Sequence, residues 1–337
     1  MSLVKSESYI FCVAPMMNWT DRHCRKIMRR LSRHARLYSE MITADAILHG
    51  NRESLLAHDS DDGPTALQLG GCDPHKLAEA AQIGVDFGYD EINLNVGCPS
   101  DRVQSGRFGA CLMAEPELVG RCVTVMKQAV DTPVTVKCRI GIDQQNPEKA
   151  FFDFARHQID AGVDALIVHA RKAWLDGLSP KDNRDVPPLD YNIVHRLKQR
   201  YPRTPIIING GFVTLALASQ QLQAVNGVMI GRAAYKRPHI LAEVDRMFFG
   251  VGQPAPDLFD VVRGLIPYFA VNCEHGVPLK SMTRHLLGMF HGMPGARNWR
   301  RHLAENAHLP DAGPQIVIDA LSAVEDARER SEASQVA

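Results

Sequence analysis

The sequence predicts an α/β fold: a (β/α)8 TIM barrel of eight strands, each followed by a helix, and then a smaller all-helical domain. Two observations support this prediction. Short apolar segments alternate eight times with longer amphipathic segments, the pattern of repeated βα units. Polar residues or glycines follow nearly every apolar segment, at the strand ends where such barrels place their active sites.

The expected strands are near-continuous runs of β-branched and aliphatic residues, typical of parallel strands buried on both faces. In chain order they span 11–16, 37–42, 65–69, 91–95, 134–138, 165–169, 206–209 and 227–230. The segments between them predict helices, including 74–87, 115–130, 147–161 and 192–201, and the first two have a proline near the start.

A doubly wound open sheet is the structural alternative. It is less favoured, because no GxGxxG turn follows the first strand and because polar residues follow almost every strand. After about residue 240 the strand pattern stops, and GVGQPAP at 250–256 predicts a linker. We therefore expect a catalytic barrel over residues 1–245 and a helical domain over residues 246–337.

Composition limits the location and the partners of the chain. The formal net charge is zero, so a nucleic-acid partner would require a local basic patch. The apolar runs are about as long as strands, and the N-terminus lacks an apolar signal core, which predicts neither a membrane span nor export. Eight cysteines without CxxC or zinc-type spacing predict reduced thiols, a cytoplasmic protein and no metal site. We expect a monomer, because no long apolar surface stripe is evident.

Glycines follow the last two expected strands. Asn209, Gly210 and Gly211 follow strand seven, and Gly231 with Arg232 follows strand eight, where barrels commonly bind a phosphate. Glycines allow backbone N–H groups to approach phosphate oxygens, and a following helix N-terminus adds a favourable dipole. Tight turns would explain either glycine site alone, whereas the two together favour phosphate binding.

Two strand ends have residues that suit a cofactor. Lys137 ends strand five within VTVKCR, where its charge is costly to bury without a partner. It could pair with an anionic cofactor or act as a Schiff-base nucleophile, and a lysine reaching solvent at the rim is the structural alternative. His169 ends strand six at an equivalent depth, which favours a cofactor contact over a histidine satisfied within the core.

Cys98 lies between Gly97 and Pro99, just past strand four. Most single cysteines are small core hydrophobes. These neighbours instead predict an irregular, accessible loop above the barrel mouth. Cys111 is the only rival for a reactive thiol.

Eight motifs together resemble one enzyme family through nearly the whole chain. They are APMMNWTD at 14–21, LQLGG at 67–71, NLNVGCPS at 93–100, GACLM at 109–113, VKCRIG at 136–141, VHARKAW at 168–174, NGG at 209–211 and GRAAY at 231–235. This set resembles the tRNA-dihydrouridine synthases. Segment 170–191 is further similar to the DusA subfamily, which acts on uridines 20 and 20a of the tRNA D-loop.

The resemblance implies FMN as the cofactor and NADPH as its reductant. It implies that Cys98 is the catalytic acid, which protonates C5 of uracil after hydride reaches C6 from the flavin. It also implies that Asn95 touches the substrate nucleotide, which must leave the base stack. The flavin would be held by Pro15, Met16, Met17, Gln68, Lys137 and His169, and its phosphate by Asn209, Gly210, Gly211, Gly231 and Arg232.

Segment 275–304 contains five lysines and arginines, four histidines and no acidic residue. Within it Arg297 and Arg300 are three apart and would share a helix face, and the planar arginine fork suits phosphate oxygens. By resemblance these arginines, with Lys181 and Arg184 after strand six, hold the tRNA. A solvated basic helix face is the alternative.

A second basic stripe on the first helix is expected to face solvent without a function; it comprises Arg22, Lys26, Arg29, Arg33 and Arg36.

Three other functions compete with this one. A small-molecule flavin oxidoreductase of the dihydroorotate dehydrogenase type would not need the basic segment. A class I aldolase-like lyase would use Lys137 as a Schiff base, and bound flavin would exclude it. A non-catalytic RNA-binding module would leave Cys98 and the polar strand ends unexplained.

Overall fold

The computed structural model describes residues 9–59, 62–100 and 106–336 of the chain. The chain divides into two compact units. The first comprises residues 1–20 and 34–231, and the second comprises residues 21–33 and 232–337. The first helix of the chain therefore groups with the C-terminal helices. The domain boundary expected at residue 245 stays a prediction.

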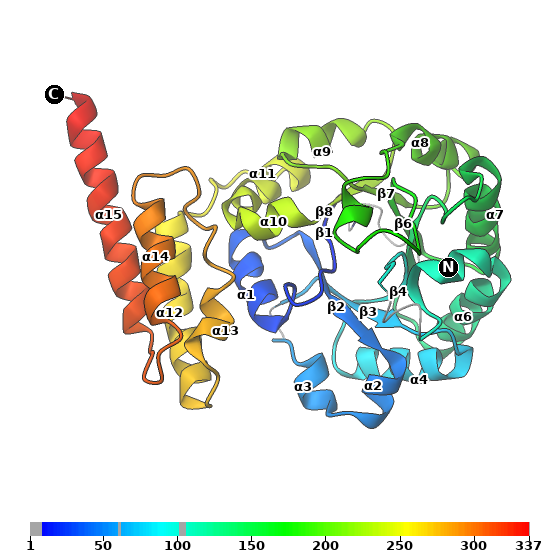
Figure 1. Ribbon diagram of the computed structural model, residues 1–337, viewed down its shortest axis with the longest axis horizontal. Coiled ribbons are helices and arrows are strands. Elements are labelled where there is room, and N and C mark those ends of the chain that lie inside the picture. The colour runs from blue at the N-terminus through cyan, green and yellow to red at the C-terminus, as the bar shows by residue number, and fades with distance from the viewer. Residues whose placement is uncertain (1–8, 60–61, 101–105, 337) are drawn as a thin grey trace. The chain divides into compact units, whose positions relative to one another are not determined.

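Eight parallel strands of the first unit form a closed barrel, in which each strand pairs with the next and β8 pairs with β1 (Figure 1). This closed barrel, together with the C-terminal helical region, confirms the predicted fold class. The strands are β1 (Phe11–Val13), β2 (Arg36–Thr43), β3 (Thr65–Gly70), β4 (Glu91–Val96), β5 (Val134–Arg139), β6 (Ala165–His169), β7 (Ile206–Asn209) and β8 (Gly227–Ile230).

The first strand is shorter than expected. It ends at Val13, and the chain then turns, with the backbone N–H groups of Trp19 and Thr20 both donating to the carbonyl of Met16 at 3.0 Å. Pro15 has no N–H to donate to a ladder, which explains why the strand does not continue to residue 16. The APMM segment is therefore a turn at the strand end, where its backbone is available to a ligand.

Helices of the first unit lie around the barrel (Figure 1). Proline occupies the first turn of α4, α6 and α7, where its missing N–H costs nothing, as expected for two of the three. Asp73 and Asn146 cap α4 and α7 with their side chains. The helices are α2 (Ala44–His49), α3 (Arg52–Leu56), α4 (Pro74–Asp86), α6 (Pro116–Ala129), α7 (Pro147–Asp160), α8 (Tyr191–Arg200) and α9 (Leu215–Gln221).

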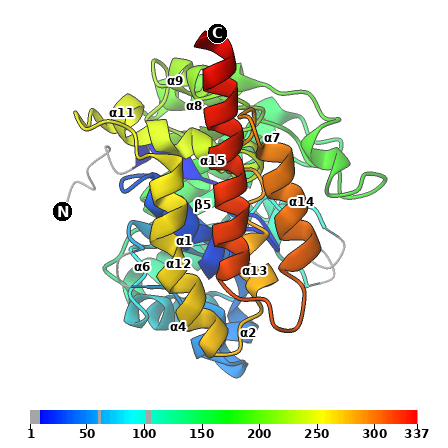
Figure 2. The ribbon, with the colours of Figure 1, turned by 90° about the vertical axis from the view of Figure 1, so that its left-hand side faces the viewer.

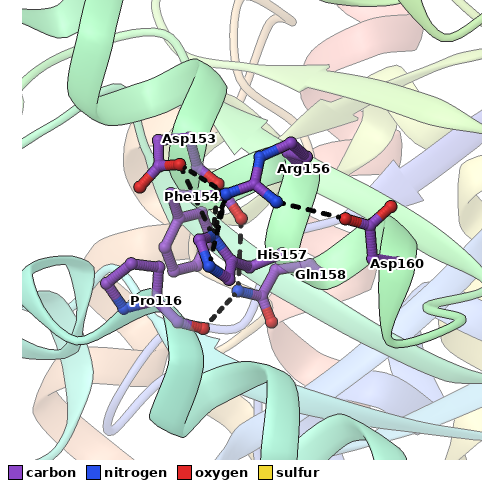
Figure 3. Close-up of polar contacts among 7 residues, drawn as sticks. All are labelled: Pro116, Asp153, Phe154, Arg156, His157, Gln158 and Asp160. Carbon is purple, nitrogen blue, oxygen red and sulfur yellow. Dashed lines mark hydrogen bonds and ion pairs between the residues drawn. The ribbon is translucent and has the colours of Figure 1, made fainter.

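The joint between α6 and α7 shows how these helices are fixed (Figure 3). The buried side chain of Gln158 donates through Nε2 to the carbonyl of Pro116 at 3.0 Å, satisfying a polar group at the start of α6. On the exposed side of α7, Arg156 bonds to Asp153 at 2.8 Å and to Asp160 at 3.3 Å. Such exposed pairs contribute little to stability, so the buried amide is the structurally important contact.

The second unit is helical, and Figure 2 shows α12, α14 and α15 side by side. Its core is aromatic: the Phe290 ring lies 4.9 Å from those of both Phe259 and Trp299, and Trp299 Nε1 donates to the carbonyl of Leu286. Its helices are α1 (Arg22–Leu31), α10 (Arg232–Lys236), α11 (Val244–Phe249), α12 (Leu258–Glu274), α13 (Leu279–Thr283), α14 (Ala296–Asn306) and α15 (Gln315–Val336). The expected linker at 250–256 lies between α11 and α12.

The basic stripe of α1 does not face solvent as a whole. Arg22 and Arg33 are exposed as expected, but Lys26 and Arg29 are each only 6% exposed. The helix packs against α12, with Lys26 Nζ 5.9 Å from the centre of the Tyr268 ring, so the inner side of the stripe is covered. The fifth member, Arg36, is not on the helix at all but begins β2, where it is buried. Within the residues that the structure describes, no helix is both long enough and apolar enough to cross a membrane.

Candidate active site

Cys98 lies on the loop after β4, and hydrogen bonds hold this loop on both sides of the thiol. The side-chain Oδ1 of Asn95 accepts from the backbone N–H groups of Gly97 and Cys98, each at 3.0 Å. The carbonyl of Cys98 accepts from the N–H of Ala110 at 2.9 Å. The half-buried thiol lies 3.6 Å from the hydroxyl of Ser100. The loop is therefore fixed while its sulfur stays accessible.

The rival thiol, Cys111, has a different environment. It belongs to the 3-10 helix η2 (Gly109–Ala114), and its Sγ donates to the carbonyl of Phe108 at 3.2 Å. Burial, with the nearby Glu115 carboxylate, raises the pKa of the Cys111 thiol. A thiol with a raised pKa that already donates its proton to a carbonyl is the poorer proton donor. The geometry favours Cys98.

Gln68 and Asn95, expected at the flavin and at the substrate, contact each other directly. Asn95 Nδ2 donates to Gln68 Oε1 at 2.8 Å, and Gln68 Nε2 donates in turn to Asn93 Oδ1 at 2.8 Å. All three side chains are buried in the barrel interior. The sequence prediction assigned no role to Asn93, although the alternating polar residues of NLNV were a signal that both asparagines face inward.

Lys137 projects from β5 toward the end of β7. Its Nζ donates to Asn209 Oδ1 at 3.2 Å, while Asn209 Nδ2 donates to the carbonyl of Met229 at 2.7 Å. Burial, with the charge of Arg139 adding to it, lowers the pKa of Lys137 to about 8. No carboxylate among the described residues forms an ion pair with this lysine. An unbalanced, half-buried cation is costly, and a bound anion would remove that cost.

Arg139 is a second cation of this region, and the sequence prediction assigned no role to it. It is buried, and burial lowers its pKa to about 10. Its guanidinium donates to three carbonyls: Gly97 at 3.1 Å, Lys172 at 3.0 Å and Asn183 at 2.8 Å. It thereby joins the loop of Cys98 to the long loop after β6. Its position two residues after Lys137, on the same side of β5, was the available signal.

The glycines after β7 adopt conformations that other residues rarely adopt. Gly210 has φ 121° and Gly211 has φ 75°. A Cβ on Gly210 would lie 2.8 Å from His169 Cδ2, and one on Gly211 would lie 2.5 Å from Leu189 Cδ1. The structure thus brings His169 against Gly210, and the close approach of neighbouring side chains to this stretch of backbone is possible only because both glycines lack a Cβ.

Gly231 ends the barrel beside the first turn of the chain. A Cβ there would lie 3.5 Å from Ala14 Cβ and 3.8 Å from Met16 Sδ, so Gly231 adjoins the APMM turn. Met17 in that turn is 53% exposed. Arg232 follows directly as the first residue of α10. The three glycines at the ends of β7 and β8, Gly210, Gly211 and Gly231, together with the uncompensated Lys137, fit an anionic, phosphate-bearing cofactor.

The four expected tRNA contacts are on the surface of the two units. Lys181 and Arg184 are exposed at the ends of the 3-10 turn η3 (Asp182–Arg184), which the buried amide of Asn183 anchors through Trp174. Arg297 and Arg300 are exposed on α14. In the described part of the chain, neither of these two arginines forms a hydrogen bond or an ion pair. Their donors are available to an anion.

No group of three or more histidine, cysteine, aspartate or glutamate side chains among the described residues is arranged to hold a metal ion. The fold and the site together define a (β/α)8-barrel enzyme, with an accessible thiol beside a strand-end site that suits an anionic cofactor.

The chain belongs to the dihydrouridine synthase (Dus) family, whose model matches residues 12–325. It is 52% identical over 315 residues to a tRNA-dihydrouridine(20/20a) synthase of Yersinia pestis, covering 93% of this chain and 91% of the relative. It is 51% identical over 322 residues to an Escherichia coli protein of the same name, covering 95% and 97% of the two chains. The predicted family and an enzymatic function are therefore confirmed.

A solved structure shares the fold at low sequence identity. Morphinone reductase superimposes with a TM-score of 0.51 at 13% identity, covering 74% of this chain and 87% of that one. This likeness supports the barrel architecture.

Proposed function

We propose that the chain reduces uridines 20 and 20a of tRNA to 5,6-dihydrouridine in the cytoplasm, with FMN as cofactor and NADPH as reductant. The observation that supports this most is the Cys98 loop, whose thiol is accessible while its backbone is fixed by Asn95. The relatives that are about half identical over almost the whole chain have this activity in their names. We further propose that the enzyme acts as a monomer.

Bound FMN would supply the hydride that reaches C6 of the uracil ring, and NADPH would be the source of that hydride. The Cys98 thiol gives its proton to C5, so that the S–H bond breaks, a C–H bond forms, and the C5–C6 double bond becomes single. The thiolate then takes a proton from solvent. General acid catalysis of this kind contributes about 10²–10⁴-fold to a rate.

The other site residues would bind and orient the reactants. Lys137 and His169, with Gln68 and the turn Pro15–Met16–Met17, would hold the flavin ring, and the positive charge of Lys137 would be balanced there. Asn209, Gly210, Gly211, Gly231 and Arg232 would hold its phosphate. Asn95 has its Oδ1 and one amide hydrogen engaged within the chain, which leaves the second amide hydrogen for the uracil.

The tRNA would be held through its phosphates. Lys181 and Arg184 on the first unit and Arg297 and Arg300 on the second would provide charge-assisted hydrogen bonds. The uracil would have to leave the base stack to reach the thiol. Local arginine and lysine positions, rather than the zero net charge, would provide this affinity.

The test is a Cys98→Ala variant assayed on tRNA from cells that lack this enzyme, with dihydrouridine at positions 20 and 20a measured by mass spectrometry. We expect the variant to keep its bound flavin, visible in the absorption spectrum, and to lose nearly all product. Cys111→Ala is the matched control and should keep its activity. Full activity of Cys98→Ala would remove this thiol from the mechanism, and a wild-type protein that takes up no flavin would refute the proposed function.

A further inference from the structure

A single chain of side-chain hydrogen bonds crosses the barrel interior and ends at the backbone of Cys98. It begins at Glu91, whose Oε1 accepts from the Thr135 hydroxyl at 2.5 Å. Thr135 Oγ1 accepts from Asn93 Nδ2 at 2.8 Å, and Asn93 Oδ1 accepts from Gln68 Nε2 at 2.8 Å. Gln68 Oε1 accepts from Asn95 Nδ2 at 2.8 Å, and Asn95 Oδ1 accepts from the N–H groups after it.

In every bond of this hydrogen-bond network the donor lies on the Cys98 side and the acceptor on the Glu91 side. The groups at the two ends of the network fix this order. The backbone N–H groups of Gly97 and Cys98 can only donate, so Asn95 must present its oxygen to them. Asn95 must then present its amino group to Gln68, and the same requirement passes to Asn93 and to Thr135. At the far end the Glu91 carboxylate oxygen accepts the last hydrogen bond, from the Thr135 hydroxyl. Turning over any one amide would place donor against donor or acceptor against acceptor.

The hydrogen-bonded residues of this network lie on neighbouring strands and are almost inaccessible to water. Glu91, Asn93 and Thr135 are 0% exposed, and Gln68 is 1% exposed. The strand register places Gln68 beside Asn93 and Asn93 beside Thr135, so the side chains follow the sheet from β3 to β5. At sites this inaccessible to solvent, a buried amide that lost its partner would be left as an uncompensated polar group.

We propose that Thr135 and Asn93 are positioning residues for the reaction, holding the Asn95 amide in the one orientation that fixes the Cys98 loop. The inference rests on the proposed role of Cys98. Neither residue touches the reacting atoms, and each acts through the next amide in the chain. Glu91 ends the chain, and its other oxygen lies 3.2 Å from Arg36 Nη1, which keeps the carboxylate in place.

The structure supplies a matched control for this proposal. Tyr38 also donates to Glu91 Oε1, at 2.7 Å, and is also fully buried, but it lies off the route to Cys98. Tyr38→Phe and Thr135→Val therefore each remove one buried hydroxyl from the same carboxylate oxygen. A purely structural role for the buried network would make the two substitutions equivalent, whereas a positioning role would separate them.

The experiment measures kcat and KM for uridine reduction in tRNA, the rate of flavin reduction by NADPH, and thermal stability, all in the flavin-loaded enzyme. We expect Thr135→Val to lower kcat about 10-fold to 100-fold, the scale of a small misplacement of a catalytic group. We expect KM for tRNA and the NADPH reaction to be unchanged, and Thr135→Ser to restore kcat. Tyr38→Phe should lose comparable thermal stability yet keep its kcat.

The second readout does not depend on activity. The rate at which iodoacetamide alkylates Cys98, followed by mass spectrometry of its peptide, should rise severalfold in Thr135→Val and stay unchanged in Tyr38→Phe. This comparison tests the inference even if the wild-type protein makes no dihydrouridine, which would refute only the proposed function. Wild-type kcat and alkylation rate in Thr135→Val, or equal losses in both variants, would overturn the inference.

A further variant keeps the test decisive if Thr135→Val does not fold. Asn93→Thr changes the residue that joins Gln68 to Thr135. Threonine is favoured in strands, but its side chain is too short to reach both partners. The same fall in kcat and the same rise in alkylation rate are expected. Wild-type values in a folded Asn93→Thr protein would overturn the inference.

Discussion

Lys137 Nζ donates a hydrogen bond to Asn209 Oδ1 at 3.2 Å, joining the ends of β5 and β7 inside the barrel. The two strands are not neighbours, because β6 lies between them. Side chains from alternate strands fill such barrels in layers, and Lys137 on β5 and Asn209 on β7 meet in one of them. Lys137 has no carboxylate partner among the residues that the structure describes, and the consequences of this unbalanced charge can be measured.

Replacing this cation should stabilise the cofactor-free protein. Burial lowers the pKa of Lys137 to about 8, from an ordinary value of 10.5, so the fold opposes its charge. Below pH 8 the lysine is charged in both states, and Lys137→Met should raise the unfolding free energy by up to about 3 kcal/mol. Between pH 8 and pH 10.5 only the unfolded chain keeps the charge, so the advantage of the variant should shrink as pH rises.

Urea unfolding of both proteins at several pH values measures this difference. Lys137→Met should also bind FMN more weakly, since the charge that favours an anion is gone. The exposed Lys76, which pairs with Asp45, gives the control: Lys76→Met should show no such gain. A Lys137→Met protein less stable than wild type at pH 7 would contradict the interpretation of Lys137 as an uncompensated cation.

The glycine pair after β7 should be required for the cofactor. Gly211→Ala places a Cβ at φ 75°, 2.5 Å from Leu189 Cδ1, and should lower the affinity for FMN measured by fluorescence titration. Gly162→Ala is the control, because φ is 84° there but the nearest contact would be an ordinary 3.8 Å. Each substitution should cost about 1–2 kcal/mol of stability from the backbone conformation alone. Equal FMN affinity in the two variants would argue against a phosphate at Gly211.

The arginines of α14 should contribute phosphate contacts. Arg297→Ala with Arg300→Ala should weaken tRNA binding and reduce the slope of log affinity against log salt by about one unit for each lost contact. NADPH oxidation through the flavin should be unaffected. A matched control removes Arg246 and Arg263, two exposed arginines of the same unit that pair with Glu243 and Asp260. If both double variants change the salt slope equally, the α14 arginines act only through net charge.

The ion pair at the other end of the barrel should matter for stability. Arg36 and Glu91 are both buried and lie 3.2 Å apart, and the Arg36 guanidinium lies 5.1 Å from the centre of the Tyr9 ring. Arg36→Met leaves a buried carboxylate without its charge partner and should lower the unfolding free energy by about 3–5 kcal/mol. The exposed pair of Arg196 with Glu148 is the comparison, and Arg196→Met should change stability little. Similar effects of the two substitutions in urea unfolding would contradict this prediction.

The sequence predicted strands better than side-chain contacts. The last three strands have the predicted bounds, because continuous aliphatic runs bounded by polar residues mark buried parallel strands. All strands of a parallel barrel end on the same face, so the strand-end positions of Lys137, His169 and the glycines also predicted that these residues lie close together. The exposure of α1 was predicted wrongly for Lys26 and Arg29, because charge pattern alone does not reveal which helix packs against another.

The contacts of Gln68 depend on strand register, which local sequence does not determine. A shift of one residue between β3 and β4 would have turned Asn93 away from it. Arg139 shows the same limit: its three carbonyl partners come from two loops far apart in the chain. The resemblance to a family supplied the expected functional positions, which stay predictions, whereas the contacts that support them depend on the folded arrangement of strands and loops.

The membership of α1 in the second unit has a practical consequence for dissecting this enzyme. The chain enters that unit after residue 20, returns to the barrel at residue 34 and leaves it again after residue 231. No single cut therefore frees the two units: truncation after residue 245 would keep α1 but remove Tyr268, against which Lys26 and His23 pack. An isolated barrel would lack both residues 21–33 and residues 232–337. A deletion of the C-terminal helices alone, made to locate tRNA affinity, would therefore also expose the side of α1 that packs against Tyr268.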